Sequence, residues 1–300
     1  MPTKKCSVEQ YLRSIGKVFA TVGAINPRHS KLSQLDFRLG RKLATYAKQA
    51  PPPTRVCLIP VSILQALDSA YQGGTECQQA ISDLAWIAFF FLPKPGEYCR
   101  GGADTAHHFF LLRDLHFFIG QHPFNAASPS ASPSTRARAD FISLLFTTQK
   151  NGVKGESIGH GRTGHPQGCP VSALRRRVTY LRCHGATGTT PLAAVRHKDK
   201  WVTIHSTDIM AAIHAVVRAA GPTIGFTPQD VSTRSLRAGG AMALLTARVN
   251  PDTIWLIGRW RRDTMLRYLH TTSKKFTDGF AVRMFQYGDY VLIPTAHATG

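Results

Sequence analysis

Apolar side chains recur every three or four positions through the first 50 residues, which is the period of amphipathic helices. Ser7, with Gln10 three residues later, has the spacing of a helix N-cap. Asn26-Pro27 predicts a turn, and a second apolar stripe begins at Leu35. We therefore predict two helices. The second has a basic outer face, which fits a solvated surface and a contact with an acidic partner equally well; it is formed by Arg38, Arg41, Lys42 and Lys48.

Three consecutive prolines at residues 51–53 separate this segment from the rest of the chain. Such a run is extended and stiff, and it cannot continue a helix. It is the strongest boundary signal in the sequence. It predicts a helical domain over residues 1–50, a linker over 51–60 and a larger domain over 61–300.

Two further helices are predicted directly after this linker, over residues 61–71 and 75–92. Residues 84–92 are the most apolar run of the chain and end at Pro93. A membrane-spanning helix needs roughly 20 apolar residues. This run therefore predicts a helix buried in a protein core.

The middle of the chain changes to strand-like patterns. Residues 109–119 are rich in aromatic side chains, and residues 141–148 form a second strand that returns over 156–159 after a turn at 149–155. The Pro-, Ser- and Ala-rich stretch over 121–138 predicts a flexible loop inserted in the sheet. Together these patterns predict an α+β fold that is mainly helical and contains a small antiparallel sheet.

A helix predicted over residues 171–181 contains three consecutive arginines. Successive residues point in different directions around a helix, so the three cannot all contact one phosphate. We expect Arg175 and Arg176 to line a surface that binds nucleic acid. A short strand over 201–204 and a helix over 207–219 follow.

The last helical pattern is built around Arg237, which precedes four small residues at 238–241. Small residues let a helix pack closely against its neighbour, so this arginine should be held on packed backbone. Asp252 can cap a second helix, and Gly258 ends it. A third helical run then carries Tyr268.

The net charge indicates the class of partner more clearly than any single motif. The 300-residue chain has 37 Lys and Arg against 17 Asp and Glu, a net charge of +20. Such an excess favours a polyanionic partner, because each phosphate that a protein neutralises releases a condensed counterion. A ribosomal or membrane-surface protein would be similarly basic. Nucleic acid is the partner that we expect.

Six cysteines are scattered along the chain, without a C-x-x-C pair. The residues after Met1 are polar and do not resemble a secretory signal. We therefore expect reduced thiols in an intracellular protein and no zinc site.

Residues 258–268, which read GRWRRDTMLRY, together with Arg237 resemble the tyrosine recombinases and phage-type integrases. More narrowly, they resemble the recombinases of eukaryotic mobile elements of the DIRS and Crypton kind. That family uses an arginine, a lysine, a His-x-x-Arg pair, a His or Trp, and a nucleophilic tyrosine. The resemblance covers roughly residues 80–275 and is strongest over 236–268. It implies a tyrosine recombinase catalytic domain, preceded by a partial all-helical core-binding domain that clamps DNA from the opposite side.

By this resemblance, Arg237 matches the second arginine of the family and Tyr268 matches its nucleophile. Trp260 or Arg259 matches the His/Trp position. Arg234 stands where the family has the histidine of His-x-x-Arg. An arginine there keeps a positive charge but cannot act as a base, because guanidinium does not lose its proton in proteins.

Two further positions follow from the resemblance. Lys94 stands where the family has its first arginine, in an Arg-x-x-Glu pattern, and Arg100 is the alternative. Lysine retains the charge but lacks the planar, two-pronged donor of arginine. The family keeps its catalytic lysine at the tip of a β-hairpin, a place taken here by Lys150 or Lys154.

The resemblance implies breakage and rejoining of double-stranded DNA through a covalent 3′-phosphotyrosine, without metal or cofactor. It also implies that further copies of the chain assemble on the DNA, in the nucleus and away from membranes. The catalytic residues would be Tyr268, Arg237, Arg234, Lys94, Trp260 and Lys150. The residues expected to contact DNA are Arg259, Lys154, Arg175, Arg176, Arg38, Arg41 and Lys42. The alternatives are a catalytically inactive DNA-binding module derived from a mobile element, and a scaffold for acidic proteins.

Overall fold

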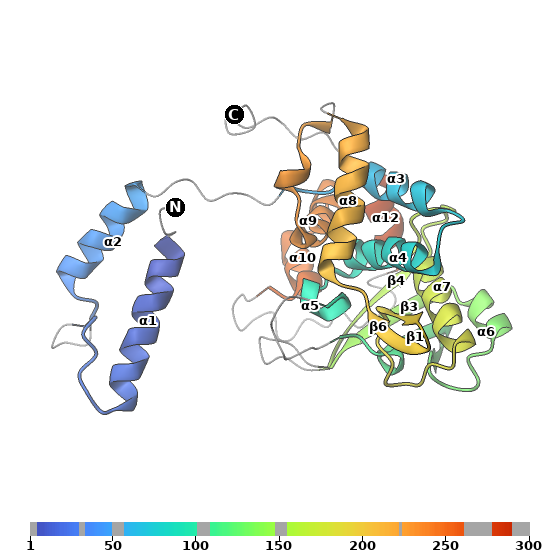
Figure 1. Cartoon of the computed structure of the whole chain (residues 1–300), viewed down its shortest axis with the longest axis horizontal. Coiled ribbons are helices and arrows are strands. Elements are labelled where there is room, and N and C mark those ends of the chain that lie inside the picture. Colours follow the sequence, from blue (N-terminus) through green and yellow to red (C-terminus); the bar gives the residue numbers. More distant parts are fainter. Residues whose placement is uncertain are drawn as a thin grey trace. The chain divides into compact units, whose positions relative to one another are not determined.

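The computed structural model describes residues 5–29, 34–49, 57–100, 109–147, 155–221, 224–260 and 278–289. The chain divides into two compact units, Met1–Arg55 and Val56–Gly300, and each is described by itself (Figure 1). Within the described residues, no helix is long and apolar enough to cross a membrane.

The first unit contains the two predicted helices, α1 (Lys5–Thr21) and α2 (Phe37–Gln49). The expected cap at Ser7 is wrong, because α1 begins at Lys5 and Ser7 lies inside it. The Asp36 carboxylate starts α2 by accepting hydrogen bonds from the backbone N–H groups of Arg38 and Leu39, at 2.9 and 3.0 Å. The basic side chains predicted to face outward on α2 are exposed: Arg38, Arg41 and Lys42.

The core of the second unit is built around helix α4 (Glu76–Phe91), which lies among the other helices in Figure 1. Thr75 caps it, and all residues from Ala80 to Phe91 are buried. This confirms the buried helix predicted from the apolar run. Its packing partners are α3 (Val61–Tyr71), α7 (Pro170–Cys183), α8 (Ser206–Ala220) and α9 (Thr233–Thr246).

A four-stranded antiparallel sheet packs below these helices, with the strand order β2-β1-β3-β4. Strands β3 and β4 form the predicted hairpin, in register from Phe141 opposite Gly161 to Phe146 opposite Glu156. At the other edge, Pro123 on β2 lies opposite Phe118 on β1. The strands are β1 (Leu115–Ile119), β2 (His122–Asn125), β3 (Phe141–Phe146) and β4 (Glu156–Gly161).

The flexible loop predicted over residues 121–138 is wrong, because this stretch contains β2 and a short helix, α6 (Pro133–Arg138). Gly120 adopts a positive φ of 58° and permits a two-residue turn into β2. The Ser132 hydroxyl caps α6 by accepting the Thr135 N–H at 3.1 Å. Arg136 is buried and donates to the carbonyl of Ala131, which orders the segment.

A separate hairpin of β5 (Ala194–His197) and β6 (Lys200–Thr203) precedes α8, which confirms the strand and helix predicted there. Shorter elements complete the second unit: α5 (Pro95–Tyr98), α10 (Pro251–Gly258), α12 (Phe280–Gln286), and single 3₁₀ turns at Leu112–Asp114 and Pro228–Asp230. The second unit is therefore a mixed α+β structure in which helices predominate.

His160 on β4 joins the sheet to α4. Its Nε2 lies 2.8 Å from the carbonyl oxygen of Phe90, and its ring packs edge-on against Phe91. Full burial lowers the pKa of His160 from its ordinary value to about 4. The imidazole is therefore neutral in the folded protein at neutral pH.

The free energy of unfolding should therefore fall as the pH drops below the ordinary histidine pKa of about 6.5, because only the unfolded chain takes up the proton. Between pH 7.5 and pH 5, His160 should lower the free energy of unfolding by about 2 kcal/mol. Urea unfolding of wild type and His160→Gln at both pH values measures this change. The variant should lose this part of the pH dependence, whereas the same change at exposed His122 should keep it. Equal pH dependence in wild type and His160→Gln would contradict the prediction.

Candidate functional site

Helix α9 supplies the rigid support for Arg237. A Cβ atom added at Gly240 would overlap the carbonyl oxygen of Phe89, and one added at Gly239 would overlap the backbone of Ile59. The helix therefore packs backbone against backbone, as its small residues predicted. The Tyr98 hydroxyl donates to the carbonyl of Thr233 at 3.3 Å and ties α5 to the first residue of α9.

Arg237 is half-buried near the start of α9. Its Nη2 donates to the Gly258 carbonyl, and its Cζ lies 4.6 Å from the centre of the Trp260 ring. Its Nε is buried without a hydrogen-bond partner among the described residues. Burial lowers the pKa of Arg237, and the nearby Glu97 carboxylate opposes this shift. These contacts hold the guanidinium in a fixed position.

The end of α10 places Trp260 over this arginine. Asn250 caps the helix by accepting the Asp252 N–H at 2.8 Å, so the cap predicted at Asp252 is wrong. The helix ends at Gly258, as predicted, and the next residue is left-handed with a φ of 52°. A Cβ at Gly258 would overlap the Trp260 ring, so glycine at this position lets the ring lie where it does. Trp260 is 36% exposed and also contacts Trp255 edge-on.

Arg259 does not lie on a DNA-facing surface, where we expected it. Its side chain is only 2% exposed and forms an ion pair with Glu97 at 2.9 Å. Burial lowers the pKa of Arg259 to about 10, with Glu97 opposing, so the guanidinium is charged at neutral pH. Of the two candidates for the His/Trp position, Trp260 contacts Arg237, whereas Arg259 is a buried structural group.

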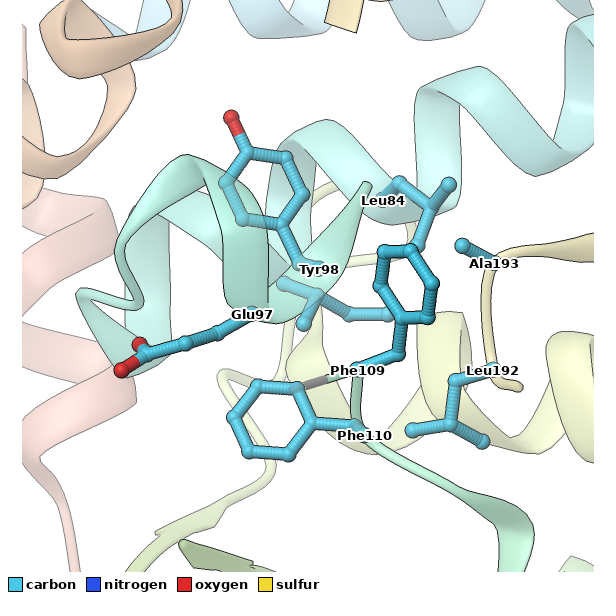
Figure 2. Close-up of a pocket in the computed structure, with 8 residues that line it drawn as sticks. Leu84, Glu97, Tyr98, Phe109, Phe110, Leu192 and Ala193 are labelled. Carbon is cyan, nitrogen blue, oxygen red and sulfur yellow. The ribbon is translucent and has the colours of Figure 1, made fainter. Parts of the chain in front are cut away.

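Lys94 lies in the junction between α4 and α5. Its backbone N–H donates to Oε2 of Glu97 at 2.6 Å, the same oxygen that pairs with Arg259. Figure 2 shows the Glu97 carboxylate pointing away from Phe109 and Leu192, two of the side chains that line an adjacent apolar pocket. That pocket has no room for a water molecule, so it is part of the core.

These contacts join segments that are far apart in the sequence. The Arg259 guanidinium lies 3.5 Å from the centre of the Phe146 ring at the end of β3, in addition to its contact with Glu97 on α5. Trp260, the next residue, packs on Arg237 of α9. The β3–β4 hairpin, α5, the start of α9 and the end of α10 therefore meet in one place. Lys150, Lys154 and Tyr268 lie outside the described residues.

Other predicted site residues have varied surroundings. Arg234 is exposed one turn before Arg237, so the two share a face of α9. Arg100 is exposed, and its backbone pairs with residues 204 and 206. The Arg38, Arg41 and Lys42 face belongs to the first unit.

The two arginines expected on α7 differ in their surroundings. Arg175 is half-buried, and Arg176 donates through Nε to the buried carboxylate of Asp83 at 2.8 Å. Burial raises the pKa of Asp83 to about 6, and Arg176 opposes the shift. The third member, Arg177, is buried and donates to the carbonyls of Leu192 and Ala194. Only part of the Arg176 side chain, 41%, faces solvent.

Glu97 was absent from the predicted site residues. The available signal was one acidic residue three positions after Lys94, in a chain that has few acidic residues. Among the described residues, no group of three His, Cys, Asp or Glu side chains could hold a metal ion.

No protein-family model matches the chain, and no curated protein sequence matches it.

Proposed function

We propose that this chain binds duplex DNA and breaks and rejoins its strands through Tyr268, in the manner of a tyrosine recombinase. The observation that supports this most is the meeting of four segments around Glu97 and Arg259. They carry the positions that the resemblance assigns to phosphate binding and proton transfer. Tyr268 follows Trp260 by only eight residues.

The proposed chemistry begins with attack of the Tyr268 oxygen on a DNA phosphorus. A phosphotyrosine bond forms at the 3′ side, and the bond from phosphorus to the 5′ oxygen breaks. Lys150 or Lys154 gives its proton to that leaving oxygen, and solvent takes the tyrosyl proton, because Arg234 cannot accept one. Attack by a 5′ hydroxyl reverses these steps and rejoins the strand.

Arg237 would stabilise the charge that develops on the phosphate oxygens. Its partly buried guanidinium is more effective there than an exposed one, because nearby water screens it less. Arg237 is only half-buried, so a phosphate oxygen would reach its exposed part. Arg234 and Lys94 would add positive charge on either side.

Duplex DNA is the proposed partner, bound by several copies of the chain in the nucleus. The net charge of +20 supports a polyanion. The exposed basic face of α2 is a second DNA-contacting surface in this proposal; it consists of Arg38, Arg41 and Lys42.

A covalent-trapping experiment tests the proposal. A duplex nicked close to the cleavage position loses a short fragment after attack, so the covalent complex cannot revert. Because the target sequence is unknown, a library of random nicked duplexes should be used, and the adduct detected after denaturing electrophoresis. We expect an adduct that forms in EDTA. If wild-type protein binds duplex DNA but forms no adduct with any member, strand transfer is ruled out.

The second candidate is a DNA-binding module without catalysis. It is favoured by the engagement of Arg237 with the Gly258 carbonyl and by the lack of a base at Arg234. This function predicts salt-sensitive duplex binding without an adduct. Adduct formation that appears only in the Lys94→Arg, Arg234→His double variant would indicate that catalysis has decayed.

A further inference from the structure

Arg259 holds several parts of the site at once. Its guanidinium donates to the carbonyls of Ile257 at 3.2 Å, Leu92 at 3.3 Å and Phe91 at 3.4 Å, in addition to Glu97 at 2.9 Å. These groups belong to the end of α4, to α5 and to the end of α10. One side chain therefore fixes the spacing between the junction that carries Lys94 and the turn that carries Trp260.

Stability alone does not explain this ion pair. Removing two charges from water is costly, and apolar residues of the same volume often stabilise a fold equally well. The second carboxylate oxygen of Glu97, Oε1, is buried without a hydrogen-bond partner among the described residues, which adds to the cost. The pair therefore points to a role in the geometry or electrostatics of the site.

Glu97 lies next to the proposed phosphate site. Arg259, which pairs with it, directly precedes Trp260, and Trp260 packs on Arg237. The Glu97 carboxylate also acts electrostatically on Arg237. Without Arg259, this carboxylate would attract the Arg237 guanidinium, which would then bind a phosphate more weakly.

We propose that Arg259 is a positioning residue that occupies Glu97 and so keeps Arg237 available to the DNA phosphate. This inference rests on the proposed function for its substrate. Arg259 itself is buried and does not contact the DNA. Its left-handed backbone, with φ 52°, also turns the chain so that Trp260 lies on Arg237.

The test compares Arg259→Met, Glu97→Gln and the double variant in single-turnover adduct formation. Arg259→Met should slow the reaction about 10²-fold, the usual effect of losing one stabilising donor. Duplex affinity at fixed salt should stay within about threefold, because the other basic side chains of a chain with net charge +20 still bind the DNA backbone. The double variant should recover at least about tenfold of the rate, because no carboxylate remains to attract Arg237. A purely structural role would give no such recovery.

A matched control and a second measurement keep the outcomes distinct. Arg177→Met removes another buried arginine, one that donates to the carbonyls of Leu192 and Ala194 rather than to Glu97, and should leave the rate within about threefold of wild type. Titration with inorganic phosphate, followed by tryptophan fluorescence because Trp260 packs on Arg237, needs no catalysis. Phosphate affinity should fall in Arg259→Met and return in the double variant.

If the double variant stays as weak as Arg259→Met in phosphate binding, or if wild type shows no phosphate response, the inference is overturned. An adduct from wild type in that case would leave the proposed function intact. If phosphate binding follows the expected pattern but no adduct forms, the proposed function fails and the inference stands. Circular dichroism identifies any unfolded variant. Arg259→Lys, which keeps the charge, should then show intermediate phosphate affinity.

Discussion

Replacing Tyr268 with phenylalanine is expected to abolish the covalent protein–DNA adduct and to leave duplex affinity unchanged. The change removes only the hydroxyl oxygen that would attack phosphorus, and phenylalanine has no oxygen to take its place. Adduct formation should fall by at least about 10⁴-fold, as it does when other enzymes lose a nucleophile. Denaturing gels measure the adduct, and fluorescence anisotropy measures the affinity.

Tyr287→Phe provides the matched control. This tyrosine is 51% exposed just after α12, and removing its hydroxyl should change neither adduct formation nor affinity. If Tyr268→Phe forms the adduct at the wild-type rate, another residue is the nucleophile. If only Tyr287→Phe loses the adduct, the assignment of Tyr268 is wrong.

Replacing Gly240 with valine is expected to lower the free energy of unfolding of the second unit by more than about 4 kcal/mol. A side chain at this position would overlap the carbonyl oxygen of Phe89, which belongs to the backbone of α4 and cannot rotate away. Helices α4 and α9 would have to separate, and contacts along both would be lost. Urea unfolding followed by circular dichroism measures the change.

Gly96→Ala is the control for this substitution. Its added methyl group would meet no atom within 4 Å, so it should change the free energy of unfolding by less than about 0.5 kcal/mol. A Gly240→Val protein as stable as Gly96→Ala would show that α4 and α9 do not pack as closely as described.

The helices around the core could be predicted because their signals are local. The apolar run that ends at Pro93 identified α4, and the small residues after Arg237 predicted the close contact of α9. The hairpin of β3 and β4 followed from two apolar runs around a turn. The error at residues 121–138 has an equally local cause. A stretch rich in proline, serine and alanine is typical of a loop, but the same residues also occur in tight turns and at helix starts. Packing in the folded chain selects the turn and the helix here.

Pairings between distant residues could not be predicted in this way. Arg259 and Glu97 are separated by 162 positions, and no periodic pattern connects them. An arginine in a basic chain suggests a surface that binds an anionic partner. In the structure, however, Arg259 and Arg177 are buried, and Arg176 forms an ion pair with Asp83. The sequence identified which segments carry charge. Only the fold distinguished the buried arginines that brace the protein from Arg237, which is half-buried and packs against Trp260.

The proline at position 123 has a consequence for how copies of this chain can associate. It lies in β2, which in the described structure is the outer strand of the four-stranded sheet. Proline has no amide hydrogen to offer to an added strand, so this border resists the edge-to-edge pairing that leads many β-proteins to aggregate. Growth of the sheet from one molecule into the next is thus disfavoured along β2. Assemblies on DNA would have to be held together through other surfaces.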